Sequence, residues 1–331
     1  LSLDALSLQY LFGLDVCPIG KSYELVGLPG SCKSFFCHEL GRWHVYGRTD
    51  IVPFDATQHT GYYVYNLAEP NRDQPHLRRS VTRHPLDCYQ VFANTNHKYV
   101  EDWQDACTEV AKTFHETTGP NGKLVAQGDT PFIGCVAVDS FTGLQTRKEY
   151  DDTYESGHAD PNYAHTAKSI SAYLKSFMPM IGGWPISFVG TNHMKPKKEA
   201  GRIDYHVPGG YALEFCDSIR FRMQMLKPLD LVRSDGGRSV RFHTEKNSFT
   251  AAAGYRSLDV NVTWCGNGDE QLSTWQWHDA TIHLLTKGLD DKSKRKVDKV
   301  LDLEIDANNR KVTSSTLGVK KVSYHEGGEA I

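Results

Sequence analysis

The segment from Phe132 to Val138 is the feature that most constrains how this chain can fold. It is a continuous run of apolar and small residues that ends at Asp139. A run without polar alternation is typical of a strand that is buried on both faces of a parallel sheet. Further strands are expected at Tyr23–Gly27, Tyr62–Asn66 and Ile186–Gly190, and helices at Ser34–Leu40, Tyr99–Thr117 and Ala164–Met180. This alternation predicts an α/β fold with a mostly parallel central sheet flanked by helices.

The rest of the chain suggests one large unit and a small appendage. An apolar segment with helical spacing opens the chain at residues 1–14, and Ser257–Trp264 alternates like a half-buried strand. After Gly268 the composition becomes more charged. We therefore expect a core over residues 1–268 and a small C-terminal region over residues 269–331.

Charge and composition exclude some classes of protein. The net charge is -3 and the pI about 6.6, so a contact with nucleic acid must be local rather than spread over the whole surface. The eight cysteines show neither CxxC nor zinc-site spacing, which favours free thiols in a reducing cytosol. The longest apolar run is too short to span a membrane and no signal-peptide pattern is visible, so we expect a cytoplasmic protein without a membrane partner. The sequence begins at Leu1 rather than with methionine, which leaves open an N-terminal element that precedes it.

A glycine-containing segment, Gly27-Leu-Pro-Gly-Ser-Cys-Lys-Ser34, joins the first expected strand to the first expected helix. In a phosphate-binding loop, backbone N–H groups and the helix N-terminus form a cradle for an anion. The cradle residues would be Gly27, Gly30, Ser31 and Cys32, with Lys33 reaching the β- and γ-phosphates and Ser34 giving a hydroxyl to Mg²⁺. Cys32 stands where the usual pattern has glycine. A strand-to-helix turn with an incidental Lys-Ser pair therefore remains an alternative.

Two acidic residues follow expected strands. Asp139 ends the run from Phe132, where a carboxylate could organise Mg²⁺, although an N-cap of a following helix would explain it equally simply. Glu69 follows the strand Tyr62–Asn66 and could orient a water as a general base; a solvated loop glutamate is the simpler reading.

The order of these segments resembles RecA-type recombinases over residues 1 to 268. The resemblance rests on Ser2-Leu-Asp-Ala-Leu-Ser7 through Gly20, the Gly27–Ser34 loop, Glu69, Val138-Asp-Ser140, Thr191-Asn-His193 and Gly209-Gly-Tyr-Ala-Leu213. It is closest to the UvsX-like branch of bacteriophages. That branch also tolerates a non-glycine residue before the loop lysine and carries Asn-His, here Asn192-His193.

The resemblance implies a RecA-like P-loop ATPase core that uses ATP and Mg²⁺. Lys33 and Ser34 would bind phosphate and metal, Asp139 would organise the metal, and Glu69 would be the catalytic base. His193 would sense the γ-phosphate. The remaining nucleotide contacts would be Asp73 and His76 at the adenine, and Lys246 at the nucleotide of a neighbouring subunit. Ser248 stands where the family often has a second lysine.

The resemblance also implies two DNA-binding loops. The second would span residues 194–208 as a mobile loop, and its phosphate contacts would be Lys195, Lys197, Lys198 and Arg202. Tyr205 could stack on bases, and Gly209 and Gly210 follow. A solvated surface loop is the alternative for such a lysine cluster. The first loop would fall within residues 150–163, which are acidic.

We therefore expect an ATP-dependent recombinase that forms helical filaments on single-stranded DNA and pairs it with homologous duplex DNA. Mediator and single-strand-binding proteins would be further partners, and the location would be the host cytoplasm if the protein is phage-encoded. One alternative is an accessory filament protein that uses the nucleotide as a structural clamp. Another is a hexameric RecA-fold helicase or transport ATPase.

Overall fold

The structure is a computed structural model, and it gives the course of the chain in seventeen stretches. These are residues 6–14, 17–46, 61–69, 89–93, 98–117, 132–156, 164–182, 186–199, 202–208, 211–228, 237–250, 256–265, 272–277, 280–281, 303–306, 311–314 and 319–323.

A nine-stranded sheet forms the centre of the molecule, in the order β11-β10-β9-β8-β1-β5-β4-β2-β3. Its strands are β1 (Ser22–Gly27), β2 (Gly61–Leu67), β3 (Tyr89–Ala93), β4 (Phe132–Asp139), β5 (Ser187–His193), β8 (Ile219–Pro228), β9 (Gly237–Asn247), β10 (Ser257–Cys265) and β11 (Leu272–Trp275). Within this order, the six neighbouring strands β8-β1-β5-β4-β2-β3 all pair in parallel. The expected α/β architecture with a mostly parallel central sheet is confirmed.

The burial of the central strands explains their sequences. All six residues of β1 are buried, and β4 is buried from Ile133 to Asp139. A strand with neighbours on both sides and helices over both faces has no solvent-facing position, so it needs apolar residues throughout. The charged Glu24 in the middle of β1 is therefore an exception that calls for a specific partner.

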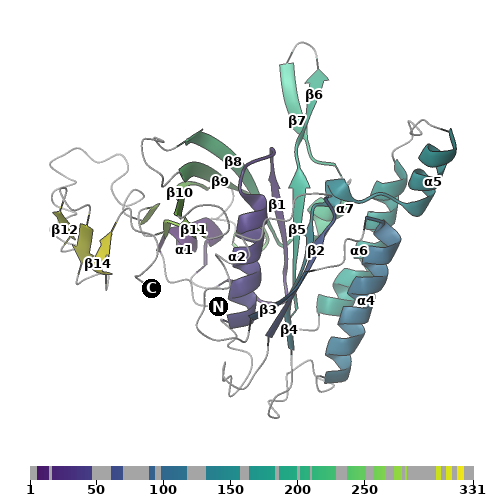
Figure 1. Ribbon diagram of the computed structural model, residues 1–331, viewed down its shortest axis with the longest axis horizontal. Coiled ribbons are helices and arrows are strands. Elements are labelled where there is room, and N and C mark those ends of the chain that lie inside the picture. The colour runs from purple at the N-terminus through teal and green to yellow at the C-terminus, as the bar shows by residue number, and fades with distance from the viewer. Residues whose placement is uncertain are drawn as a thin grey trace.

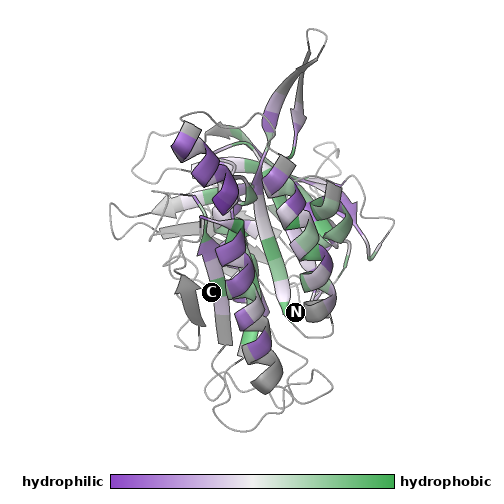
Figure 2. Ribbon diagram, turned by 90° about the vertical axis from the view of Figure 1, so that its right-hand side faces the viewer, coloured by the Kyte–Doolittle hydropathy of each residue, from purple (hydrophilic) through white to green (hydrophobic). Residues whose placement is uncertain are grey.

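Helices cover both faces of this sheet (Figure 1). They are α1 (Leu6–Phe12), α2 (Lys33–Tyr46), α4 (Val100–Thr117), α5 (Arg147–Ser156), α6 (Ala164–Gly182) and α7 (Tyr211–Cys216), with a short 3₁₀ turn η1 (Phe141–Gly143). Helix α2 packs against the strands on one side, while α4 and α6 lie on the other. Figure 2 views the molecule from the side of α4 and α6, with hydrophobic sheet residues behind the hydrophilic outer turns.

The four strands β8 to β11 pair antiparallel at one side of the sheet. Strand β11 lies beyond the domain boundary expected at residue 268, so the large sheet continues into the C-terminal region. Trp275 and Trp277 are buried in the same core cluster as Phe36, which explains why this segment belongs to the core. Strands β12 (Leu303–Asp306), β13 (Lys311–Ser314) and β14 (Val319–Ser323) form a separate antiparallel sheet.

Two expectations about loops are wrong in part. The segment expected as a mobile loop over residues 194–208 contains an antiparallel hairpin, β6 (Lys195–Glu199) and β7 (Arg202–His206), which projects from the body of the molecule (Figures 1 and 2). Its strands satisfy their backbone groups in pairs, which a mobile loop could not do. Part of the expected first loop is helix α5, whose acidic and polar residues suit a solvated helix.

The register of the parallel strands brings their carboxyl ends to one edge of the sheet. Gly27 pairs with His193, Val138 with Gly190, and Leu67 with Asp139. Ligands of parallel α/β sheets bind at this edge, because the loops that follow the strands converge there.

Candidate functional site

The loop after β1 is built around two glycines. At Gly27 an added Cβ would lie 2.2 Å from the carbonyl oxygen of Met223 and 2.6 Å from Ser31 Oγ, so no other residue fits without a shift of the backbone. Gly30 has a φ of +78°, a left-handed conformation that glycine adopts without a steric penalty. The loop then enters α2 at Lys33.

Cys32 takes the left-handed conformation that glycine usually provides, with a φ of +61°. A residue with a Cβ in this region costs about 1 kcal/mol or more, so the loop keeps a strained shape despite the substitution. The loop therefore keeps a left-handed residue directly before Lys33, although its sequence departs from the usual pattern. Burial raises the pKa of the Cys32 thiol, and the nearby cations Arg238 and Lys33 lower it in part.

Lys33 is buried, and its ammonium group points into the loop. Its Nζ donates to the carbonyl oxygens of Gly27 and Leu28, each at 3.0 Å, and to Ser31 Oγ at 3.4 Å. The same nitrogen lies 3.4 Å from Nδ1 of His193. A cation held by neutral carbonyls can exchange them for an anionic phosphate, because a hydrogen bond between two charged groups is stronger.

His193 connects Lys33 to Glu69. A lysine ammonium can only donate, so Nδ1 of His193 accepts and the ring proton lies on Nε2. Nε2 then donates to Oε1 of Glu69. The same carboxylate oxygen accepts a hydrogen bond from Ser140 Oγ at 2.6 Å. The side chains of three separate strand ends are thus joined in one chain of hydrogen bonds.

Asp139 lies buried at the end of β4 beside this chain. Its Oδ2 accepts from the Tyr65 hydroxyl at 2.7 Å, and its Oδ1 accepts from the hydroxyl of Thr191. These two donors fix the orientation of the carboxyl group. Asp139 does not serve as a side-chain cap for η1: the residue that precedes that turn is Ser140, which makes no capping bond.

Ser34 follows Lys33 in the first turn of α2 and is half-buried. In the described stretches, no group of three or more His, Cys, Asp or Glu side chains is arranged to hold a metal ion. Mg²⁺ bound with a nucleotide needs no such group, because phosphate oxygens and water supply most of its ligands. A serine hydroxyl and one fixed carboxylate, as in Ser34 and Asp139, fit that mode.

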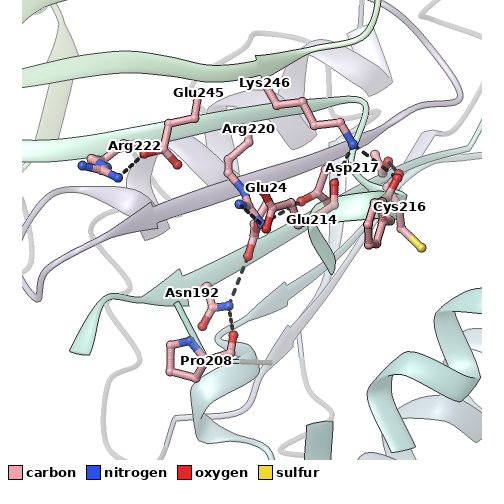
Figure 3. Close-up of polar contacts among 12 residues, drawn as sticks. Glu24, Asn192, Pro208, Glu214, Cys216, Asp217, Arg220, Arg222, Glu245 and Lys246 are labelled. Atoms are coloured by element: carbon pink, nitrogen blue, oxygen red, sulfur yellow. Dashed lines mark hydrogen bonds and ion pairs between the residues drawn. The ribbon is translucent and has the colours of Figure 1, made fainter. Parts of the chain in front are cut away.

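Some residues expected at this site lie elsewhere or outside the described stretches. Asp73 and His76 lie outside them. Lys246 lies on β9 opposite Arg220, and its ammonium bonds the carbonyl oxygens of Glu214 at 2.5 Å and Phe215 at 3.2 Å, at the end of α7 (Figure 3). The structure therefore does not bring Lys246 to the loop of its own chain.

The hairpin carries the residues expected to contact DNA. Its register pairs Lys195 with His206, Lys197 with Asp204 and Lys198 with Ile203. The remaining pairs are Pro196 with Tyr205 and Glu199 with Arg202. Because neighbouring positions of a strand alternate between faces, Lys195 and His206 fall on one face, and Pro196 and Tyr205 on the other.

Exposure at the hairpin is clear for two of these side chains. Lys195 is exposed and Tyr205 is 43% exposed. Gly209 and Gly210, also expected to contact DNA, lie outside the described residues. The hairpin begins two residues after His193, so it continues directly from the strand that contacts Lys33 and Glu69.

Arg238 was not anticipated from the sequence. Its guanidinium donates from β9 to the carbonyl oxygen of Gly30 at 3.1 Å, beside the loop. Nothing in its local sequence separates it from the other basic residues of β9. Only the antiparallel strands beside β1 bring it there.

The chain matches no protein-family model, and no curated protein matches its sequence. No helix within the described stretches is both long and apolar enough to cross a membrane.

Proposed function

We propose that this protein is an ATP-dependent DNA recombinase with a RecA-like core, which forms filaments on single-stranded DNA and pairs it with homologous duplex DNA. The observation that carries the proposal is the contact of one strand end, at His193, with both Lys33 and Glu69. The hairpin, on which Lys195 and Tyr205 are exposed, follows that strand end directly. A nucleotide at the loop and a polyanion at the hairpin would therefore act on the same strand.

The loop supports ATP as the substrate. Its glycines, the left-handed Cys32 and the N-terminus of α2 form the shape and the electrostatic environment that bind phosphate. Lys33 would neutralise the β- and γ-phosphates once it leaves the carbonyl oxygens that hold it. Ser34 and Asp139 would hold Mg²⁺, which supplies charge neutralisation for the leaving phosphate.

Glu69 is suited to act on the water that attacks the phosphate. Its carboxylate is held by Ser140 and His193, so its orientation is set before the substrate binds. A carboxylate held in this way can accept the water proton. His193 lies between this base and Lys33, which suits it to report the presence of the γ-phosphate.

The hairpin supports single-stranded DNA as the partner. The hairpin combines the basic residues Lys195, Lys197, Lys198 and Arg202 with Pro196, Ile203 and Tyr205, so it would offer both phosphate contacts and surfaces on which bases can stack. The overall charge of -3 makes such a local contact necessary. Helical filaments, a homologous duplex, and mediator and single-strand-binding proteins complete the proposed assembly.

An accessory filament protein that binds nucleotide as a structural clamp is the second candidate. The observation that favours it is Cys32, which makes the loop more crowded than glycine would. The two candidates agree on nucleotide and DNA binding and differ in whether ATP is hydrolysed.

The test compares steady-state ATP hydrolysis with and without single-stranded DNA. The recombinase proposal expects hydrolysis that DNA stimulates in the parent and that Lys33→Ala abolishes. Lys112→Ala, at an exposed position of α4, is the matched control and should hydrolyse ATP as the parent does. Nucleotide binding without hydrolysis would favour the clamp. Parental hydrolysis in Lys33→Ala would remove the loop from the active site.

A further inference from the structure

Glu24 and Arg220 form a buried ion pair in the middle of the central sheet (Figure 3). Glu24 lies on β1 and is fully buried, and Arg220 lies opposite it on β8. Arg220 Nε and Nη2 lie 2.6 Å and 2.5 Å from Oε2 of Glu24. Such a pair is a poor device for stability, because desolvation of both charges offsets most of their attraction. Its presence in an otherwise apolar strand indicates a positioning role.

The other oxygen of Glu24 holds a third residue, Asn192. The Asn192 side chain donates from Nδ2 to Oε1 of Glu24 at 3.1 Å and to the carbonyl oxygen of Pro208 at 2.6 Å. Pro208 lies two residues beyond the end of the hairpin strand β7. One amide group therefore ties the segment that leaves the hairpin to β1, the strand that leads into the phosphate-binding loop.

Asn192 is placed between two residues of the candidate nucleotide site. Thr191 bonds Asp139, and His193 contacts Lys33 and Glu69. Alternation along a strand directs the side chain of Asn192 away from the face used by its two neighbours. The end of β5 thus contacts the nucleotide site through one face and the hairpin exit through the other.

Two further acidic side chains lie near Arg220 besides Glu24. Glu214 and Asp217 each lie 3.7 Å from its guanidinium, and Asp217 is also buried. The arginine is held by its two short contacts with Oε2 of Glu24, and the other two acidic side chains lie farther from its guanidinium. Glu24 is consequently a rigid acceptor, and a shift of Asn192 must stretch either its bond to Glu24 or its bond to Pro208.

We propose that Asn192, held by the Glu24–Arg220 pair, is the positioning residue that transmits a movement of the β5 end to the base of the hairpin. The inference rests on the proposed function, since it requires nucleotide and DNA to bind at these two places. Glu24 and Arg220 serve as the fixed reference against which the hairpin moves. Asn192 itself contacts neither ligand.

The experiment measures how strongly single-stranded DNA binds with and without a slowly hydrolysed ATP analogue. Asn192→Ala removes both bonds of the amide. Asn192→Ser keeps a hydroxyl that can donate only one hydrogen bond, so it cannot bridge Glu24 and Pro208. Because the hydroxyl can still bond one of these buried acceptors, this variant should fold more stably than Asn192→Ala. The matched control is Gln104→Ala, which removes a comparable amide bond between α4 and the carbonyl oxygen of Ser169 at 3.1 Å, away from both sites.

The parent should bind DNA about 5- to 150-fold more tightly with the analogue, the usual range for coupled sites. In both Asn192 variants this ratio should fall towards one, while analogue affinity and nucleotide-free DNA affinity each stay within about twofold of the parent. Gln104→Ala should keep the parental ratio, which separates a positioning role from a general loss of stability. Hydrogen exchange of residues 202–208 should respond to the analogue in the parent and not in the variants.

The outcomes separate the two proposals. A folded Asn192→Ala or Asn192→Ser protein with the parental ratio would overturn the inference and leave the proposed function standing. A parent that binds the analogue or DNA without any coupling would overturn the proposed function and the inference with it.

Discussion

The Nζ of Lys33 and the Nδ1 of His193 lie 3.4 Å apart at the edge of the sheet where β1 and β5 end. Lys33 opens the helix after the loop that follows β1, whereas His193 is the last residue of a strand 160 positions later. Because the imidazole also bonds Glu69, a displacement of Lys33 by phosphate changes the partners of the proposed base. This contact is the basis of the first two predictions.

Replacement of His193 by alanine should uncouple the two proposed ligands. The variant should still bind ATP, because Lys33 and the loop are unchanged. ATP should no longer raise the affinity of the protein for single-stranded DNA. Titration of a labelled single strand with and without nucleotide measures the effect. His165→Ala, on helix α6, is a control that should keep the parental response. If ATP raises the DNA affinity of His193→Ala as much as that of the parent, another residue senses the nucleotide.

Replacement of Glu69 by glutamine should slow chemistry and spare binding. The amide keeps the size of the side chain and can still contact Ser140, but it cannot accept a proton. Turnover should fall by about 10²-fold or more, the scale of a lost general base. ATP and DNA affinities are measured in parallel. Turnover at the parental rate would place the base elsewhere.

Replacement of Cys32 by glycine should preserve ATP binding and stabilise the protein slightly. Loss of the Cβ relieves about 1–2 kcal/mol of left-handed strain. The greater conformational freedom of glycine in the unfolded chain reduces this gain in stability by about 0.5–1 kcal/mol. The free energy of unfolding in urea should therefore rise by up to about 1.5 kcal/mol. Cys32→Ala keeps a Cβ and should bring no such gain; equal stability of the two variants would contradict the argument.

The hairpin lysines should govern the salt dependence of DNA binding. Replacement of Lys197 and Lys198 by alanine should weaken binding to all sequences and flatten the slope of affinity against salt by about one unit for each lost phosphate contact. ATP binding should not change. The control is Lys168→Ala with Lys175→Ala, two exposed positions on α6. An unchanged salt slope in the hairpin variant would exclude it as the DNA contact.

Asp217 should make the stability of the protein depend on pH. Burial and the neighbouring Glu24 carboxylate hold the pKa of Asp217 well above its ordinary value, and Arg220 and Lys246 offset this only in part. The native state then keeps a proton that the unfolded chain releases above about pH 4. The associated stability is complete below that pH and is lost as the pH rises towards the folded-state pKa.

Replacement of Asp217 by asparagine removes this dependence, because the amide has the shape of the protonated acid and no charge to release. The free energy of unfolding of the variant, relative to that of the parent, should rise by about 1.4 kcal/mol for each pH unit between about pH 4 and the folded-state pKa. Urea unfolding at several pH values measures the difference. Asp105→Asn, at an exposed position of α4, should show no such trend. A difference that stays constant with pH would show that Asp217 is ionised in the folded protein.

Local sequence patterns determined much of the fold. The apolar run ending at Asp139, the strand before Gly27 and the helices at 99–117 and 164–180 predicted strands and helices that the structure contains. These elements follow from hydrophobic periodicity, which depends only on near neighbours in the chain. The turn from β1 into α2 was predicted for the same reason, because its signal is contained in the eight consecutive residues from Gly27 to Ser34.

The hairpin shows where local patterns mislead. Lys-Pro-Lys-Lys-Glu has low strand propensity, and it forms β6 only because Arg202–His206 folds back on it. Strand β11 likewise joins the sheet through pairing with β10 and the burial of Trp275, which a change in composition after Gly268 could not reveal.

The sequence by itself predicted the strands β1, β2, β4, β5 and β10, the helices α2, α4 and α6, and the turn between β1 and α2. Only the tertiary structure revealed Glu24 as a buried charge and decided its partners. Glu24 and Arg220 are 196 residues apart in the sequence, and Asn192 and Glu24 are 168 residues apart. The order β8-β1-β5 makes these strands neighbours. Pairing of distant strands depends on the packing of the whole sheet, so no local segment encodes it.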